Sequence, residues 1–178
     1  MNPKINAPIS EQTQKYDGII ALSEVKFDKD NIELYGIDET NYFKGLTKSI
    51  KENGLYNPIV LYNDYECKSG HTRHKATRKN GYTHIPYILS TIDKPEDRYA
   101  NMMALMMGNM GRPSSISRSF RQVELTCHAF KEKTGSEPTD AVVQLTICPA
   151  AQISWNMYSN LKELQLHRPD LFQRVIDS

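Results

Sequence analysis

Short apolar runs and helical periodicities alternate over the first ninety residues of the chain. Short apolar segments that predict strands occupy residues 19–25, 58–62 and 85–89, and residues 65–68 can return as a further strand after a turn. Apolar spacing predicts a helix over residues 42–50, with Gly54 soon after it. A second helix is expected over residues 71–80, between the break at Ser69-Gly70 and Gly81. Asn63-Asp64 is typical of a tight turn, so a hairpin is expected inside the sheet. The pattern predicts a compact α/β unit with a mixed sheet.

Strand signals nearly disappear after residue 97, and helical spacing takes their place. The helices expected there span residues 99–107, 118–133, 140–146 and 150–164, and a last one begins at Pro169. Residues 139–164 have the layout of a helix-turn-helix, with a break at residues 147–149. The expected organisation is a flexible leader over residues 1–15, an α/β domain over residues 16–95 and a helical domain over residues 96–178.

Composition places the chain among ordinary globular proteins, with 178 residues, of which 39% are hydrophobic and 24% charged. No apolar run reaches the roughly 18 residues that a membrane-spanning helix needs, and the N-terminus lacks the apolar stretch of a signal peptide. The protein is therefore expected in the cytoplasm, without a membrane partner. Cys67, Cys127 and Cys148 form no CxxC pair, which argues against a disulfide framework and a cysteine-rich zinc site.

The net charge of +1 conceals an uneven distribution along the chain. Residues 1–47 carry net −3, whereas residues 48–84 carry net +4. Binding to nucleic acid must therefore come from local clusters of cations, because the whole-chain charge would contribute almost nothing.

The densest chemistry lies at residues 69–73, Ser-Gly-His-Thr-Arg, where a predicted strand meets a predicted helix. First turns of helices favour Asp or Glu because the helix dipole is positive there, yet this turn has neither and carries Arg73 and Lys75. A glycine, amide N–H groups at a helix start, a threonine hydroxyl and an arginine together suit a phosphate. The alternative is a solvated basic face on a surface helix.

Two histidines of the same helix, His71 and His74, are spaced i, i+3. A metal site usually needs a third protein ligand, and no carboxylate or cysteine stands at a recognisable spacing from them. A hydrogen bond from a histidine to the expected phosphate is the more economical interpretation.

Three segments resemble, in order and spacing, the N-terminal domain of the ParB family, whose fold sulfiredoxin shares. They are residues 53–61 (Asn-Gly-Leu-Tyr-Asn-Pro-Ile-Val-Leu), residues 70–76 (Gly-His-Thr-Arg-His-Lys-Ala) and Gly81 followed by Ile85-Pro86. The resemblance implies an α+β protein, with a ParB/sulfiredoxin-like mixed-sheet domain followed by an all-helical helix-turn-helix domain. The dimerisation domain that ends other family members has no counterpart, so the chain is either a short divergent member or a fragment.

The resemblance also implies a nucleoside triphosphate, CTP or ATP, bound with Mg²⁺. The residues that it implicates in nucleotide binding are Gly54, Asn57, Pro58, Ser69, Gly70, His71, Thr72, Arg73, Asn109 and Arg112. Asn109 would also reach the Mg²⁺ ion. Nucleotide would act as a switch that alters DNA contact or self-association, and a homodimer is an expected partner state.

The chain departs from the family pattern at four positions. Asn57 stands for the usual glutamine, and His71-Thr72 stands for a common Glu-Arg pair. Gly108 replaces a glutamate that would help to position Mg²⁺. Nucleotide binding is therefore expected more strongly than hydrolysis, and the protein would be at most a weak nucleoside triphosphatase. A sulfinic-acid reductase is not expected, because His71 stands where sulfiredoxin has its cysteine.

Duplex DNA is the expected macromolecular partner, either the DNA of the nucleoid or that of a plasmid or phage. The candidate DNA contacts are Arg118, Arg121, Gln152, Ser154, Asn156 and Lys162. Lys162 is the only basic residue of the expected second helix, although affinity for duplex DNA rests largely on phosphate contacts.

Two other functions stay open at this point. A phosphoryl-transfer enzyme, such as an ATPase or a nuclease, would use the same phosphate site with Glu66 as the nearest catalytic carboxylate. A protein-interaction module that has lost nucleotide binding is the second alternative.

Overall fold

The computed structural model describes residues 6–35, 41–111 and 114–177. The chain divides into two compact units. The first, the α/β unit, runs up to Ile32 and continues over Ile37–Lys94, and the second, the helical unit, contains Glu33–Gly36 and everything from Pro95 onward.

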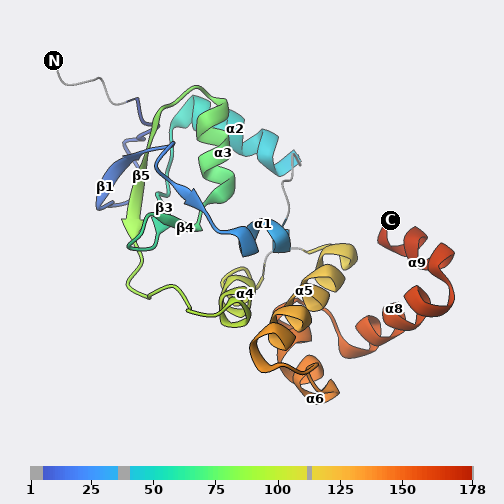
Figure 1. The fold of residues 1–178 in the computed structure, drawn as a ribbon. Helices are drawn as coiled ribbons and strands as arrows, with labels where there is room; N and C mark the ends of the chain where they lie inside the picture. Colours follow the sequence, from blue (N-terminus) through green and yellow to red (C-terminus); the bar gives the residue numbers. More distant parts are fainter. Residues whose placement is uncertain (1–5, 36–40, 112–113, 178) are drawn as a thin grey trace. The chain divides into compact units, whose positions relative to one another are not determined.

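A five-stranded mixed sheet forms the centre of the α/β unit (Figure 1). Its strands are β1 (Gly18–Ala21), β2 (Lys26–Phe27), β3 (Ile59–Leu61), β4 (Glu66–Ser69) and β5 (His84–Leu89), in the order β1-β5-β3-β4-β2. The pairs β1–β5 and β3–β4 are antiparallel, whereas β3–β5 and β2–β4 are parallel. The hairpin expected inside a mixed sheet is the β3–β4 pair.

Two helices, α2 (Asn41–Asn53) and α3 (His71–Lys79), pack against each other beside the sheet. One face of α2 covers the core with Phe43, Leu46 and Ile50, which recur every three to four residues, and Leu46 is only partly buried. The core of the α/β unit is formed by Ile20, Leu22, Val25, Phe43, Ile50, Leu55, Ile59, Leu61, Cys67, Ala76 and Ile85. Asn80 Nδ2 donates to the Thr47 carbonyl at 2.8 Å and joins the two helices.

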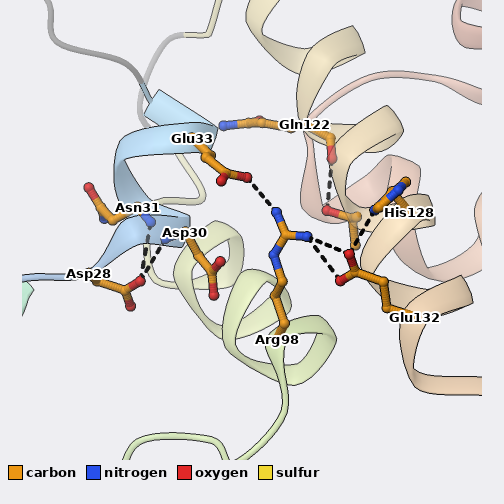
Figure 2. Close-up of polar contacts among 9 residues, drawn as sticks. Asp28, Asp30, Asn31, Glu33, Arg98, Gln122, His128 and Glu132 are labelled. Atoms are coloured by element: carbon orange, nitrogen blue, oxygen red, sulfur yellow. Dashed lines mark hydrogen bonds and ion pairs between the residues drawn. The ribbon is translucent and has the colours of Figure 1, made fainter.

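Sequence patterning did not predict β2 or the short helix α1 (Lys29–Tyr35). Both are too short to show a periodicity. The buried carboxylate of Asp28 starts the helix, because its Oδ1 accepts the Asp30 N–H at 2.8 Å (Figure 2).

The described part of the leader, residues 6–15, forms hydrogen bonds with the loop that follows α2. The Leu55 N–H donates to the Pro8 carbonyl at 2.6 Å, and the Gln14 N–H donates to the Tyr56 carbonyl at 2.9 Å. Thr13 Oγ1 donates to the Leu55 carbonyl at 2.5 Å. The described residues of the predicted leader thus pair with a loop about forty residues away, and their polar sequence gives no sign of this pairing.

The helical unit contains α4 (Arg98–Met107), α5 (Ile116–Thr134), α6 (Asp140–Val142), the π-helix η1 (Val143–Ile147), α7 (Cys148–Ala150), α8 (Trp155–His167) and α9 (Pro169–Ile176). Met102 and Met106 are fully buried in its core, beside Leu105, Phe120 and Val123. Arg98 links helices across this unit, since it contacts Glu33 and donates to Glu132 Oε2 at 2.9 Å (Figure 2).

The expected break of the helix-turn-helix lies elsewhere than predicted. Helical conformation continues from Asp140 through Pro149 to Ala150, and α8 begins at Trp155 rather than near residue 150. The π-type segment before Pro149 accommodates a residue that has no N–H to donate. Gln152 instead makes the turn, with a positive φ of 57°. No described helix is long and apolar enough to cross a membrane.

Candidate functional site: the start of helix α3

Strand β4 passes into helix α3 through Gly70. Gly70 has φ 110°, and a Cβ at this position would lie 2.7 Å from Ile59 Cγ2. Only glycine avoids both the backbone strain and the steric overlap. The first turn of α3 is therefore brought close to strand β3, with its N–H groups directed away from the helix.

No acidic residue stands in the first turn of α3, and Gly70 offers no side chain as a cap. Amide N–H groups at a helix start lack intrahelical acceptors, and the dipole makes that end positive. Thr72 and Lys75 are half-buried in the same region. The arrangement favours an anionic ligand at this helix start.

Arg73 joins the helix start to the loop before β3. Its Nη1 donates to the Asn57 carbonyl at 2.8 Å and also contacts the Pro58 carbonyl. Its Nη2 lies 3.5 Å from Ser69 Oγ. The structure thus brings together four of the residues predicted for nucleotide binding. It also shows that the guanidinium holds this loop by its backbone, which the sequence motif does not reveal.

Gly54 begins that loop at the end of α2, with φ 75°. A Cβ on Gly54 would lie 2.9 Å from the Ser10 backbone nitrogen. The leader therefore holds one side of the loop, and Arg73 holds the other. Ser10 and Thr13 belong to the surroundings of the site, although sequence reasoning missed them because no local motif marks them.

An open cleft of about 500 Å³ lies next to this loop in the α/β unit. It is lined by residues of the leader (Ala7, Pro8, Ile9, Ser10, Glu11, Gln12), the end of α2 (Lys51, Glu52, Asn53, Gly54), Tyr56 and Tyr82. The loop contributes Gly54 and Tyr56 to the cleft, whereas Gly70 and Arg73 are not among its lining residues.

The His71 side chain is largely buried beside Cys67 and Phe27. Its Nδ1 lies 3.8 Å from Cys67 Sγ, and its ring lies 5.4 Å from the Phe27 ring. Burial lowers the pKa of His71 to about 4, so the imidazole is neutral at pH 7. The phosphate contact expected of this side chain stays a prediction.

Its neighbour His74 is also buried. His74 Nε2 lies 2.9 Å from the Leu22 carbonyl, and its ring packs edge-on against Phe27. Desolvation lowers the pKa of His74 as well. Among the residues that the structure describes, no group of three His, Cys, Asp or Glu side chains is placed to hold a metal ion.

The buried Cys67 lies on β4, three residues before Gly70. Desolvation raises the pKa of its thiol to about 12, which leaves it protonated at neutral pH. A thiolate at the helix start is therefore absent from the described site.

Glu66, the candidate catalytic carboxylate, belongs to a different cluster. Its Oε1 forms an ion pair with Lys94 Nζ, which also lies 3.8 Å from Asp28 Oδ2. Glu66 precedes Gly70 by four residues of extended chain, or about 13 Å at the usual rise per strand residue. In the structure this carboxylate is engaged by Lys94 rather than by a residue of the helix start, and its catalytic role stays a prediction.

The predicted residues of the helical unit are placed by its own helices. Asn109 Nδ2 donates to the Leu105 carbonyl at 2.7 Å, just after α4. Arg112 lies outside the described residues. Ser154 caps α8, where its Oγ accepts the Met157 N–H at 3.2 Å. Asn156 is exposed in the first turn of α8.

The cations predicted to contact DNA differ in their surroundings. Lys162 Nζ lies 2.9 Å from Glu124 Oε2, so its charge is engaged within the unit. Arg121 is exposed on α5, and Arg118 is half-buried one turn earlier. Gln152 lies in the turn before α8. Of the three residues predicted to contact base edges, α8 therefore carries only Asn156 and the capping Ser154.

Comparison with known proteins identifies the family. Residues 10–106 match the family model described as the ParB N-terminal domain. No curated protein matches the chain.

Solved structures show the same fold. The chain is similar to two structures of a pNOB8-like ParB N-domain, one of them its C2221 form, at 16% identity in each case. The TM-scores are 0.63 and 0.62, with 92% and 90% of this chain and 75% and 68% of those chains covered.

A further similar structure is the C-terminally truncated chromosome-partitioning protein ParB from Caulobacter crescentus complexed with CTP-γ-S. It has 16% identity, a TM-score of 0.43, and 90% and 84% coverage of the two chains. The same ParB complexed to the centromeric parS site has 14% identity, a TM-score of 0.46, and 81% and 69% coverage. Since the family model spans more than half of the sequence, the chain belongs to the ParB N-terminal domain family.

Proposed function

We propose that this protein is a ParB-like DNA-binding protein whose α/β unit binds a nucleoside triphosphate, CTP or ATP, as a conformational switch. The observation that supports it best is the start of α3, where left-handed Gly70, a first turn without a carboxylate and Arg73 meet. Phosphate oxygens would accept hydrogen bonds from the N–H groups of the first turn and from the hydroxyl of Thr72.

Arg73 has a double role in this proposal. A guanidinium has five N–H donors, and Arg73 uses part of them on the carbonyls of Asn57 and Pro58. The guanidinium would also contact a phosphate of the ligand, so that ligand binding would tighten the loop from Gly54 to Pro58 against α3. This coupling is how nucleotide occupancy would reach other parts of the protein and alter DNA contact or self-association.

Mg²⁺ would accompany the triphosphate and neutralise part of its charge. Asn109 donates its amide N–H to the Leu105 carbonyl within the helical unit, and its part in Mg²⁺ binding stays a prediction. Binding without efficient hydrolysis is proposed, because Gly108 supplies no carboxylate and Glu66 is engaged by Lys94.

The helical unit would contact duplex DNA through its helix-turn-helix at residues 139–164. Asn156 and the capping Ser154 would approach base edges, with Gln152 at the turn. Arg118, Arg121 and Lys162 would approach phosphates. The protein would then be located with the DNA that it binds, in the cytoplasm.

Calorimetric titration of CTP, ATP, GTP and UTP with Mg²⁺ tests the nucleotide proposal. Arg73→Ala should weaken binding at least tenfold, because it removes a charge-assisted contact and releases the loop. Arg78→Ala is the matched control, since Arg78 is exposed on the same helix, and should bind as the wild type does. Background binding of all four triphosphates, or unchanged binding by Arg73→Ala, would refute the proposal.

A further inference from the structure

The layer of helices α2 and α3 is the most basic part of the chain. These two helices carry seven Lys and Arg residues and a single carboxylate, that of Glu52. Their net charge is +6, while that of the whole chain is +1. The remaining residues are therefore net acidic, and the positive charge is concentrated on one layer of the α/β unit.

Five of these cations lie outside the first turn of α3, and we call them the α2–α3 basic face: Lys44, Lys48, Lys51, Arg78 and Lys79. All five are exposed. On α2 they follow the spacing i, i+4, i+7, which places them on one stripe of the helix. On α3, Arg78 and Lys79 occupy its last turn.

The two helices hold their parts of this face together. Lys79 Nζ lies 5.0 Å from the centroid of the Phe43 ring of α2, so the last turn of α3 sits over the first turn of α2. The Asn80 side chain donates to the Thr47 carbonyl of α2 at 2.8 Å. The basic face is therefore one surface built on two packed helices, both of which rest on the core of the sheet.

The charges of the face are not neutralised within the described chain. Its closest carboxylate contact there is between Lys48 and Glu52, at 4.0 Å, with 76% and 56% of the two side chains exposed. Such an exposed pair contributes little binding energy and leaves the lysine open to another anion. The face therefore remains positive toward solvent.

We propose that the α2–α3 basic face binds the phosphate backbone of duplex DNA without sequence preference. Duplex DNA presents closely spaced phosphates, and each lysine or arginine that contacts one releases condensed counterions. Five cations on one rigid surface match this partner by charge. The face would supply phosphate contacts to a protein whose helical unit uses at least five of its cations internally.

A membrane surface fits the same face less well. Peripheral helices at membranes combine cations with several apolar side chains that insert among the lipids. Among the cations of α2 lie the exposed Gly45 and the half-buried Ser49, neither of which could insert into a lipid layer. Tyr42 is the single large apolar side chain exposed on this helix. The face therefore suits a polyanion in water.

This inference does not require nucleotide binding, so the two proposals can fail separately. The test measures binding of the full chain to a duplex of random sequence, by fluorescence anisotropy between 50 and 300 mM salt without nucleotide. The variant Lys44→Gln/Lys48→Gln/Arg78→Gln removes three cations of the face, and glutamine keeps a similar helix propensity. It should weaken binding by on the order of 100-fold at the lowest salt, and reduce the salt slope by about 3.

The matched control is Lys15→Gln/Lys26→Gln/Lys29→Gln, which changes the net charge equally at exposed positions of the same unit. It should retain most of the wild-type affinity and slope. Equal binding by face variant, control and wild type would overturn the proposal and leave DNA contact to the helical unit. Vesicles with anionic phosphatidylserine form the second probe. Binding to these vesicles without binding to the duplex, or no binding to either, would also overturn it.

Discussion

The two units of this protein use their cations in opposite ways. In the helical unit, Arg98, Lys131, Lys133, Lys162 and Arg168 each lie in an ion pair with a carboxylate of the same unit. In the α/β unit, the exposed cations of α2 and α3 accumulate around a single carboxylate, Glu52. Similar residues thus hold helices together in one unit and remain accessible to an external anion in the other.

This difference bears on how the proposed DNA binding would be divided between the units. A helix-turn-helix is expected to contribute base contacts, but most binding energy for DNA comes from phosphate neutralisation. The helical unit is poor in available cations, and the α/β unit has them in excess. Both the nucleotide site and the nonspecific DNA contact proposed here therefore draw on the same basic layer.

The first prediction breaks the α/β unit alone. Gly70→Ala should destabilise that unit by about 4 kcal/mol, because alanine adds positive-φ strain to overlap with Ile59. Urea unfolding separates the units, since the single tryptophan, Trp155, lies in the helical unit. The far-UV circular dichroism transition should shift, while the Trp155 fluorescence midpoint stays in place.

Gly81→Ala is the matched control for this substitution. Gly81 also has a positive φ, of 82°, but nothing lies within 4 Å of the position of an added Cβ. Its expected cost is about 1 kcal/mol. Equal effects of the two alanines would show that Gly70 is not a position of close approach.

The second prediction concerns pH. The pKa of His71 is about 4 in the folded protein and about 6.5 in an unfolded chain, so acid protonates the unfolded state first. The stabilising contribution of the neutral, buried imidazole is fully present above pH 6.5 and is lost as the pH falls toward 4. The free energy of unfolding should fall by about 3 kcal/mol over this range. Urea midpoints of the α/β unit should fall over this window.

His71→Gln should flatten that pH dependence, because glutamine does not titrate. His167→Gln serves as the control, since His167 is exposed in the helical unit. An unchanged pH profile for His71→Gln would assign the acid sensitivity to other groups, among which buried His74 is the first to test.

The third and smallest effect sharpens the comparison from the helical side. Arg98→Gln removes the links to Glu33 and Glu132 and should cost about 1 kcal/mol, because all three side chains are partly exposed. The loss should shrink in 1 M salt, where charges are screened. Trp155 fluorescence measures it, with Lys131→Gln as a control for a single exposed pair. A loss that is independent of salt would contradict an electrostatic origin.

Much of the fold followed from the sequence because its elements carry local signals. The hairpin β3–β4, helix α2 ending before Gly54, and helix α3 with its glycine at the start all lie close to their predicted positions. The α+β class and the ParB-type mixed sheet are confirmed. The short elements β2 and α1 have no such signal, since Asp28 and distant packing stabilise them.

The helix-turn-helix boundary shows a different limit. Proline normally ends a helix, so a break at residues 147–149 was the reasonable expectation. The π-helix before Pro149 lets the chain continue to Ala150, and the turn falls at Gln152 instead. Whether a helix accommodates a proline depends on how its neighbouring turns pack, which a local pattern does not contain.

The sequence by itself determined the elements, the glycine at a helix start and the concentration of positive charge, because these depend on residues near one another in the chain. Only the tertiary structure decided what each side chain contacts. It turned His71 toward Cys67 and Phe27, engaged Arg73 with two carbonyls of a loop, paired Glu66 with Lys94 and bound the leader to Leu55. Burial, pKa and ion pairing arise from contacts between distant segments, and such contacts exist only after folding.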